Sequence, residues 1–264
     1  MNKYGWDAKD YASNSQNQYT WAKELISKLQ LASDESILDI GCGDGKITAE
    51  IAQTVPKGRV VGIDSSPNMI NLAKRNFPQQ CFPNLSFELM NAQQLVFEQE
   101  FDVSFSNAAL HWIMDQKSVL AGVYKSLRSG GKTLFQMGGK GSSQPVIDIF
   151  DELKTNSKYQ SFFSDFKFPY NFLTPQEYIP LLIQAHLEPL RVELFVKDMN
   201  FLDLQGMAGW IRTTWLPFTE RVPAALREGF IREISEGYLR SHPPQTDGRI
   251  HVEMVRLEVE AKKS

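Results

Sequence analysis

A glycine-rich turn beside two aspartates is the segment of this sequence best suited to chemistry. It reads DIGCGDG from Asp39 to Gly45, and it lies between an apolar run and a helical segment that begins at Lys46. Glycines let a backbone approach a ligand closely, and a helix N-terminus offers free N–H donors. Asp64 ends the next apolar run, where its carboxylate is placed to accept hydrogen bonds from two ribose hydroxyls. The pattern predicts a site for a nucleoside.

The spacing of these glycines narrows the kind of nucleoside. The dinucleotide fingerprint G-x-G-x-x-G needs its third glycine where this chain has Lys46. The G-K-[ST] phosphate clamp of nucleotide-binding loops is also missing from the turn. The sequence therefore argues against an NAD-dependent oxidoreductase, which would also need a hydride-transfer site that the chain does not offer.

Strand-like and helix-like segments alternate over the first two thirds of the chain. Strands are expected at 36–40, 59–63, 85–90, 101–106 and 132–137, with helices at 19–30, 46–54, from Ser66-Pro67 onward and at 115–127. This alternation predicts a parallel sheet with helices on both faces. Ligands of such sheets bind outside the carboxyl ends of the strands. That edge should hold the glycine turn, Asp64, Asn91 and the segment Asn107–Trp112.

The last third of the chain has a different pattern. Residues 140–173 are rich in Phe and are expected to form an irregular lid, and a helix follows Thr174-Pro175. Strands are expected at 188–197 and 249–259, and 203–241 reads as helical between its prolines. We expect one domain over 1–264. Its cofactor-binding core would span 1–139, and lid or cap insertions at 140–175 and 199–245 would supply a pocket for the second substrate.

The turn resembles the D-x-G-x-G-x-G motif of class I S-adenosylmethionine-dependent methyltransferases. The resemblance extends to the family's ribose segment GIDSSPNM (62–69), its adenine segment NAQ (91–93) and the loop LRSGGK (127–132). It implies a Rossmann-like, mostly parallel seven-stranded sheet with a helical cap, and S-adenosylmethionine as cofactor, with S-adenosylhomocysteine as product. The cofactor contacts that it implies are Tyr11, Gln18, Tyr19, Gly41, Cys42, Gly43, Asp64, Ser65, Met69, Asn91, Ala92, Gln93, Asn107 and Trp112.

Further segments resemble the trans-aconitate methyltransferase group, whose wider relatives esterify small carboxylates. These segments are NAALHW (107–112), WIRTTWLPF (210–218) and PPQTDGR (243–249). A carboxylate is already ionised at pH 7 and needs no general base, but a buried anion needs a partner. Arg212 is the first candidate for that carboxylate clamp, because arginine binds carboxylates bidentately. His111 would orient a substrate oxygen, or act as the base if the acceptor is a hydroxyl.

The sequence leaves other functions open. The acceptor atom could instead be nitrogen, sulfur or carbon, on a small molecule or a protein, and the chain could be a non-catalytic binding protein on the same fold. The formal net charge of −3 argues against a dedicated nucleic-acid binder. Two cysteines and four widely spaced histidines make a metal site unexpected. No apolar run reaches the ~20 residues of a membrane span, and the polar N-terminus shows no secretory signal, so we expect a protein of the reducing cytoplasm. We also expect it to be a monomer.

Overall fold

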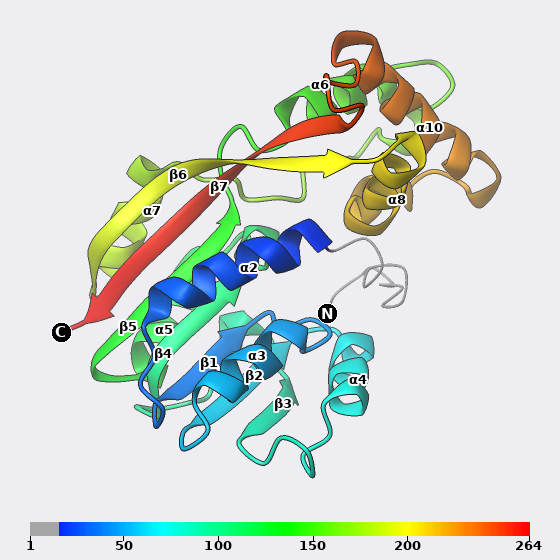
Figure 1. Cartoon of the computed structure of the whole chain (residues 1–264). Coiled ribbons are helices and arrows are strands. Elements are labelled where there is room, and N and C mark those ends of the chain that lie inside the picture. The colour runs from blue at the N-terminus through cyan, green and yellow to red at the C-terminus, as the bar shows by residue number, and fades with distance from the viewer. Residues whose placement is uncertain (1–15) are drawn as a thin grey trace.

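The structure is a computed structural model that describes residues 16–264, with side chains from Tyr19 onward. Seven strands form one sheet in the order β3-β2-β1-β4-β5-β7-β6 (Figure 1). The strands are β1 (Ser36–Ile40), β2 (Arg59–Asp64), β3 (Leu85–Leu89), β4 (Phe101–Asn107), β5 (Leu127–Gly138), β6 (Leu187–Phe201) and β7 (Ile250–Lys263). The first five pair in parallel, and β7 runs antiparallel to both β5 and β6. The predicted mostly parallel seven-stranded α/β fold is confirmed.

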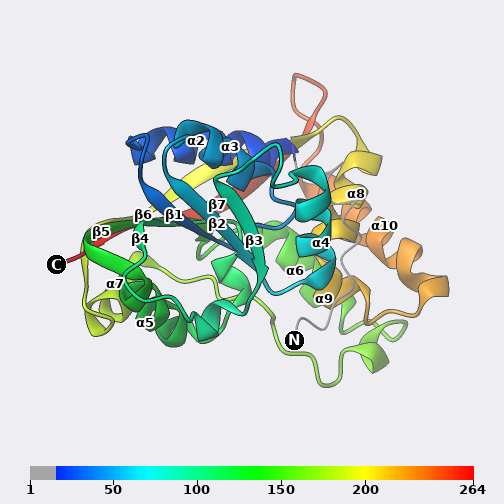
Figure 2. The same ribbon diagram turned by 90° about the horizontal axis from the view of Figure 1, so that it is seen from below.

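Helices cover both faces of the sheet, as the alternation predicts (Figure 2). On one face lie α2 (Gln16–Leu29), α3 (Lys46–Thr54) and α4 (Pro67–Asn76), which share an apolar core with Ile37 and Phe105. On the other lie α5 (Gln116–Ser126) and α7 (Pro175–Gln184), packed against Leu38 and Val61. Neighbouring residues of β1 thus point to opposite cores, which is why this strand is apolar throughout.

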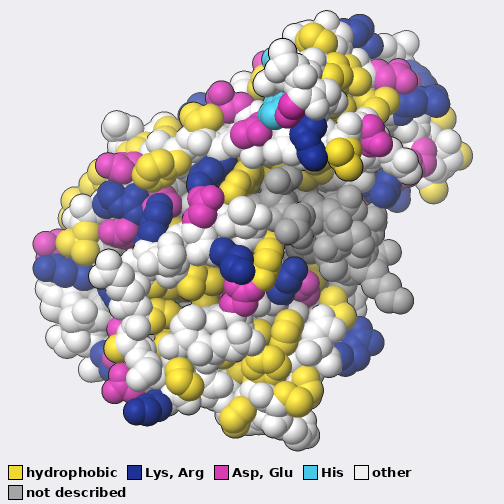
Figure 3. All heavy atoms as spheres, viewed as in Figure 1, with side chains coloured by type: hydrophobic (Ala, Val, Ile, Leu, Met, Phe, Trp, Pro, Cys, Tyr) yellow, Lys and Arg dark blue, Asp and Glu magenta, His cyan; other side chains and the backbone are white. Residues whose placement is uncertain are grey.

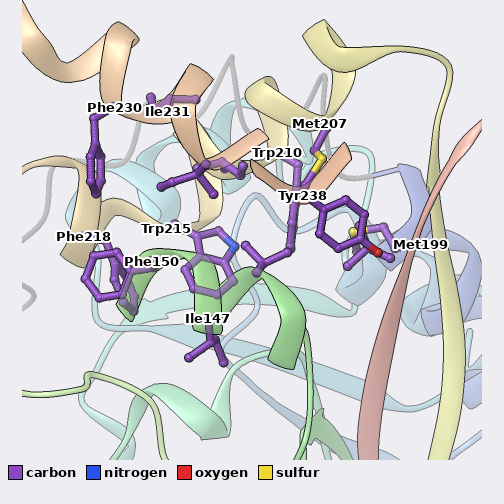
Figure 4. Packing of buried hydrophobic residues seen from close by; sticks show 14 of the residues in the cluster. Ile147, Phe150, Met199, Met207, Trp210, Trp215, Phe218, Phe230, Ile231 and Tyr238 are labelled. Atoms are coloured by element: carbon purple, nitrogen blue, oxygen red, sulfur yellow. The ribbon is translucent and has the colours of Figure 1, made fainter. Parts of the chain in front are cut away.

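A helical cap stands beyond the carboxyl ends of the parallel strands (Figure 1). It contains α6 (Gln144–Leu153), α8 (Leu204–Thr214), α9 (Leu216–Thr219) and α10 (Ala224–Ser241). The cap has its own aromatic core, in which the rings of Phe150 and Phe218 lie 4.3 Å apart, edge to face (Figure 4). The long strands β6 and β7 extend into this core through Met199 and Val252.

Helix α6 corrects the expectation of an irregular segment over 140–173. Pro145 occupies its first turn, and Val146, Ile147 and Phe150 bury one face against the cap. The glycines and serines before Pro145 hid this short helix in the sequence. The capping box at the start of α7, between Thr174 and Glu177, agrees with the helix that was expected there.

The surface carries charges of both signs, intermixed over the face shown in Figure 3. None of the helices in residues 16–264 is long and apolar enough to cross a membrane.

Candidate active site

The predicted glycine turn lies at the carboxyl edge of the sheet, between β1 and α3. Its three glycines, Gly41, Gly43 and Gly45, have φ values of 80°, 54° and 82°. These left-handed conformations strain any residue that has a Cβ. The backbone N–H groups of Gly41 and Cys42 both donate to the carbonyl of Ile63, at 2.8 and 2.9 Å. The turn is therefore anchored to the neighbouring strand β2.

The three glycines differ in what surrounds them. A Cβ at Gly41 would lie 2.2 Å from Cβ of Ala109, and one at Gly45 would lie 2.6 Å from the ring of Phe87. A Cβ at Gly43 would meet nothing within 4 Å. Two of the glycines are thus required by packing, whereas Gly43 faces open space that a ligand can enter.

Asp64 holds the turn and the following segment together. Its Oδ2 accepts a hydrogen bond from the N–H of Gly43 at 3.1 Å, and its Oδ1 accepts one from the N–H of Ser66 at 2.8 Å. Burial raises the pKa of this carboxyl, while the hydrogen bonds oppose the rise. Each carboxylate oxygen has a second lone pair, so Asp64 can still accept hydrogen bonds from a ligand.

Asp39, at the start of the turn, connects the turn to α3. It is buried, and its Oδ2 accepts a hydrogen bond from the hydroxyl of Thr48 at 2.6 Å. Burial raises its pKa to about 7, and the nearby Asp64 adds to the rise. The carboxyl therefore connects the end of β1 to α3 and has no direct path to solvent.

The other predicted cofactor residues lie around the same edge. The Oδ1 of Asn91 accepts a hydrogen bond from the N–H of Gln93 at 3.0 Å, which caps the short helix η1 (Ala92–Gln94). The Oδ1 of Asn107, at the end of β4, is buried and makes no hydrogen bond with residues 16–264. Such an atom is costly to leave unsatisfied, and an N–H or O–H group of a ligand would satisfy it. Met69 is buried in α4, and Ser65 is exposed beside Asp64.

The N-terminal residues predicted to contact the cofactor are described only in part. Tyr11 lies outside the described residues, and so does the side chain of Gln18. The hydroxyl of Tyr19 donates to Glu50 of α3, and Nζ of Lys46 lies 3.8 Å from the centre of its ring. Tyr19 is therefore held at the start of α3.

A pocket opens beside this edge, between the sheet and the cap. Six aromatic side chains line it, from α2, the β4–α5 connection, the segment 140–173 and the cap: Trp21, Trp112, Tyr170, Phe172, Trp210 and Trp215. Ala108, directly after Asn107, lines it as well. The pocket is therefore next to the end of β4. Other rings of the Phe-rich segment 140–173 face away from the pocket, because Phe163 and Phe166 pack on Phe150 in the cap core.

His111 lies in the wall of this pocket, in the short helix η2 (Leu110–Trp112). The backbone N–H of Gly138 donates to its Nδ1 at 3.3 Å. Burial and the positive charge of Arg256 hold the pKa of His111 well below its usual value, so the ring is neutral at pH 7. Because Nδ1 accepts a hydrogen bond, the proton of the neutral ring is on Nε2, which is then a donor.

Arg256 of β7 lines the same pocket, although it is not among the residues that the sequence predicts for the site. It is 4% exposed, and its guanidinium lies 5.7 Å from the ring centre of Trp21. In the alternating strand 249–259 the pattern predicts that the polar side chains face solvent. However, α2 covers that side, so the charged residues Arg256 and Glu258 are both buried.

Arg212, the predicted clamp, occupies the last turn of α8. Trp210 and Thr214 of that helix line the pocket, and Arg212 is not among the lining residues. At 100° per residue, Arg212 points about 200° away from both. The helix thus presents Arg212 on its other side. Among residues 16–264 no group of three or more His, Cys, Asp or Glu side chains is arranged to hold a metal ion.

Comparison with known proteins gives the family. A family model described as a methyltransferase domain matches residues 31–185. Trans-aconitate 2-methyltransferase of Methylobacterium radiotolerans is 27% identical over 263 residues, or 98% of each chain. The uncharacterized methyltransferase C70.08c of Schizosaccharomyces pombe is 38% identical over 146 residues, which is 54% of this chain and 55% of that protein.

The fold also matches solved structures. Geranyl diphosphate C-methyltransferase of Streptomyces coelicolor, solved with Mg²⁺, geranyl diphosphate and S-adenosylhomocysteine, superposes with a TM-score of 0.56 at 15% identity, over 93% of this chain and 77% of that one. The chain belongs to the methyltransferase domain family and is a class I enzyme that uses S-adenosylmethionine. The open cradle at Gly43 and the buried oxygen of Asn107 fit such a cofactor.

Proposed function

We propose that this methyltransferase transfers the methyl group to a carboxylate oxygen of a small organic acid. The observation that carries the proposal is Arg256, a buried guanidinium in the wall of the pocket beside the end of β4. Arginine stays protonated at every physiological pH and binds a carboxylate through two parallel N–H donors. The trans-aconitate 2-methyltransferases among the relatives, whose name specifies an acid, support the same class of acceptor.

The proposed cofactor contacts come from residues at the carboxyl edge of the sheet. The backbone of the glycine turn would lie against the bound cofactor, Asp64 would accept hydrogen bonds from its ribose hydroxyls, and Asn91 would hold its adenine. S-adenosylmethionine supplies an electrophilic methyl group when it is bound. The protein must then hold the acceptor oxygen in line with that methyl group, and such positioning contributes most of the rate enhancement.

His111 takes the role of hydrogen-bond donor in this scheme. Its Nδ1 is occupied by the N–H of Gly138, and its Nε2 carries the proton of the neutral ring. A ring in that state cannot remove a proton from a hydroxyl or a carbon acid through either nitrogen. It can donate to the second oxygen of a carboxylate, which needs no base. The state of His111 thus favours a carboxylate over acceptors that must first be deprotonated.

The cap excludes water from the acceptor. Tyr170 and Phe172 come from the proposed lid, 140–175, and Trp210 and Trp215 come from the proposed cap segment, 199–245. The hydroxyl of Tyr170 donates to the carbonyl of Thr214 at 2.9 Å, which joins the two segments over the pocket. A dry pocket strengthens the attraction between Arg256 and a carboxylate.

Arg256→Met tests the proposal. Purified protein with S-adenosylmethionine is screened against organic acids, amines and thiols, with S-adenosylhomocysteine and the methylated product measured by mass spectrometry. We expect a methyl ester from an acid, and a loss of at least a hundredfold in kcat/KM in Arg256→Met with cofactor affinity unchanged. The control is Arg59→Gln, at an exposed arginine paired with Glu100 far from the pocket. Methylation of an amine or thiol but of no acid would refute the proposal.

A further inference from the structure

The strand β6 forms one edge of the sheet and is long for such a position. It has 15 residues, against 5 in β3 at the opposite edge. In the part of the chain that the structure describes, β7 is its one neighbour in the sheet (Figure 1). Proteins usually protect long edge strands with prolines or bulges, because their outer N–H and C=O groups can pair with another chain. Pro189 and the irregularity beside it protect the start of β6, but the pairing with β7 is regular from Arg191 onward.

Two residues in the middle of β6 direct their backbone groups away from the sheet. Successive residues of a strand present these groups to alternate sides. The carbonyl of Val255 accepts a hydrogen bond from the N–H of Gly139, directly after β5, so Val255 faces β5. Val196 is the partner of Val255 in β6 and therefore faces away from β7. By the same alternation, Leu194 also presents its N–H and C=O groups to the outer side of β6.

Apolar side chains are exposed on one face of this stretch. Val192 packs against the core beneath α7, which includes Leu182. Residues two and four positions further along the strand point to the same face. There Leu194 is 39% and Val196 65% exposed. Exposed apolar side chains beside outward-facing backbone groups are typical of a surface that another strand covers.

The charged side chains lie on the other face, two residues on either side of Phe195. The side chain of Glu193 is 56% exposed, and Lys197 pairs with Glu24 of α2. An ammonium group has three donors, so Lys197 can hold a second carboxylate. The order from 193 to 197 is Glu-Leu-Phe-Val-Lys. Reversing its direction exchanges the acid and the base and keeps the three central positions apolar, so this strand is complementary to itself in an antiparallel pair.

We propose that β6 pairs antiparallel with β6 of a second copy of this chain, about a two-fold axis at Phe195, and so joins the two sheets into one. Glu193 of each copy then lies opposite Lys197 of the other. Leu194 lies opposite Val196, and these two residues exchange hydrogen bonds through their outward backbone groups. The proposal does not depend on the acceptor, and it differs from the monomer that the sequence leads us to expect.

Charge selects this register over the neighbouring ones. The axis must pass through a residue, because an axis between residues would pair an outward-facing residue with an inward-facing one. An axis at Leu194 would bring Arg191 opposite Lys197, and an axis at Glu193 would bring two carboxylates together. Like charges directly opposite each other destabilise a strand pair, and opposite charges stabilise it. The axis at Phe195 pairs opposite charges twice and like charges nowhere between 192 and 198.

Two charge reversals in the full chain test the proposal by sedimentation velocity. The wild type should form a dimer, with twice the chain mass, between about 1 and 100 μM, where a modest interface associates. Glu193→Lys and Lys197→Glu each place like charges opposite one another twice, so the Kd of each variant alone should rise at least tenfold. The two variants are complementary to each other, and their mixture should recover the dimer. Glu88→Lys, on the other edge strand β3, is the matched control and should dimerise as the wild type does.

Leu194→Pro tests the backbone pairing separately. The N–H of Leu194 faces away from β7, so a proline there removes no hydrogen bond between β6 and β7. We expect a small fall in Tm, unchanged binding of S-adenosylmethionine and loss of the dimer. Cofactor binding shows that the variant is folded, which separates loss of the interface from loss of the structure.

Three results would overturn the proposal. The first is a wild type that stays monomeric over the whole concentration range. The second is a dimer that persists in both charge variants and in Leu194→Pro, because its interface would then lie elsewhere. The third is a dimer that both charge variants lose and that their mixture does not recover, because Glu193 and Lys197 would then not face each other across the axis.

Discussion

The Nδ1 atom of His111 accepts a hydrogen bond from the backbone N–H of Gly138, 3.3 Å away. Gly138 of β5 pairs directly with Arg256 of β7. The residue that donates to His111 is therefore the neighbour of Arg256 in the sheet. The ring of Phe172 lies where a Cβ of Gly138 would be, at 2.5 Å, and only glycine permits that contact. Because Nδ1 accepts the hydrogen bond from Gly138, the proton of the neutral His111 ring is on Nε2, which faces away from β5.

His111→Gln should retain most of the activity toward acids, with kcat within about tenfold of the wild type, because the amide nitrogen of glutamine can replace the N–H donor. His111→Phe should lose tenfold to a hundredfold, since it removes the donor and keeps the ring packing. The measurement is kcat for the preferred acid in both variants. A loss of 10²–10⁴ in both would instead assign His111 a role as general base.

Asp64→Ala should weaken S-adenosylmethionine binding by about tenfold to a hundredfold, as expected for hydrogen bonds to a charged group. Calorimetric titration gives the dissociation constant directly. Asp34→Ala, at an exposed aspartate before β1, serves as the control. Equal affinities in the two variants would rule out Asp64 as the residue that holds the ribose.

Gly43→Ala should separate ligand binding from folding. Its φ of 54° costs an alanine about 1–2 kcal/mol, but its Cβ would meet no protein atom. We therefore expect a modest fall in Tm and a much larger loss of cofactor affinity, because the Cβ enters the cradle. Gly130→Ala is the matched control, with φ of 78° and equally open surroundings away from the site. If both variants bind the cofactor normally, the cradle does not hold it.

Asp39 should make the protein less stable as the pH rises. Its pKa in the folded protein is about 7 against 3.8 ordinarily, so the folded state holds this proton more tightly than the unfolded state. The resulting stabilisation is fully present below about pH 4 and is lost as the pH rises through about 7. Its upper limit is about 4 kcal/mol, from about 1.4 kcal/mol per pKa unit.

The difference between wild type and Asp39→Asn isolates the titration of Asp39 and its coupling to Asp64, because groups far from Asp39, such as His111, titrate equally in both. Asparagine retains the acceptor for the hydroxyl of Thr48. Urea unfolding between pH 5 and 8 should show the wild type losing free energy of unfolding relative to Asp39→Asn as the pH rises. A constant difference over that range would mean that Asp39 titrates at its ordinary pKa.

The sequence by itself determined the elements whose signals are local. The strand β1 and the helix α3 have the predicted bounds, 36–40 and 46–54, because an apolar run and a glycine turn specify them within a few residues. The placement of Asp64 next to Gly43 also followed from local pattern, since parallel neighbours end at the same edge of the sheet.

Only the tertiary structure decided the acceptor pocket. Its walls come from segments as distant as Trp21 and Arg256, and no spacing in the sequence relates them. Arg256 occupies a polar position of an alternating strand, and such a pattern predicts that its side chain faces solvent. In the structure α2 covers that side of the strand. Arg212 lies next to pocket residues along the chain, but the helical turn directs it away from them. Local pattern thus predicts an element and its edge, whereas long-range packing decides which charges become buried and what they face.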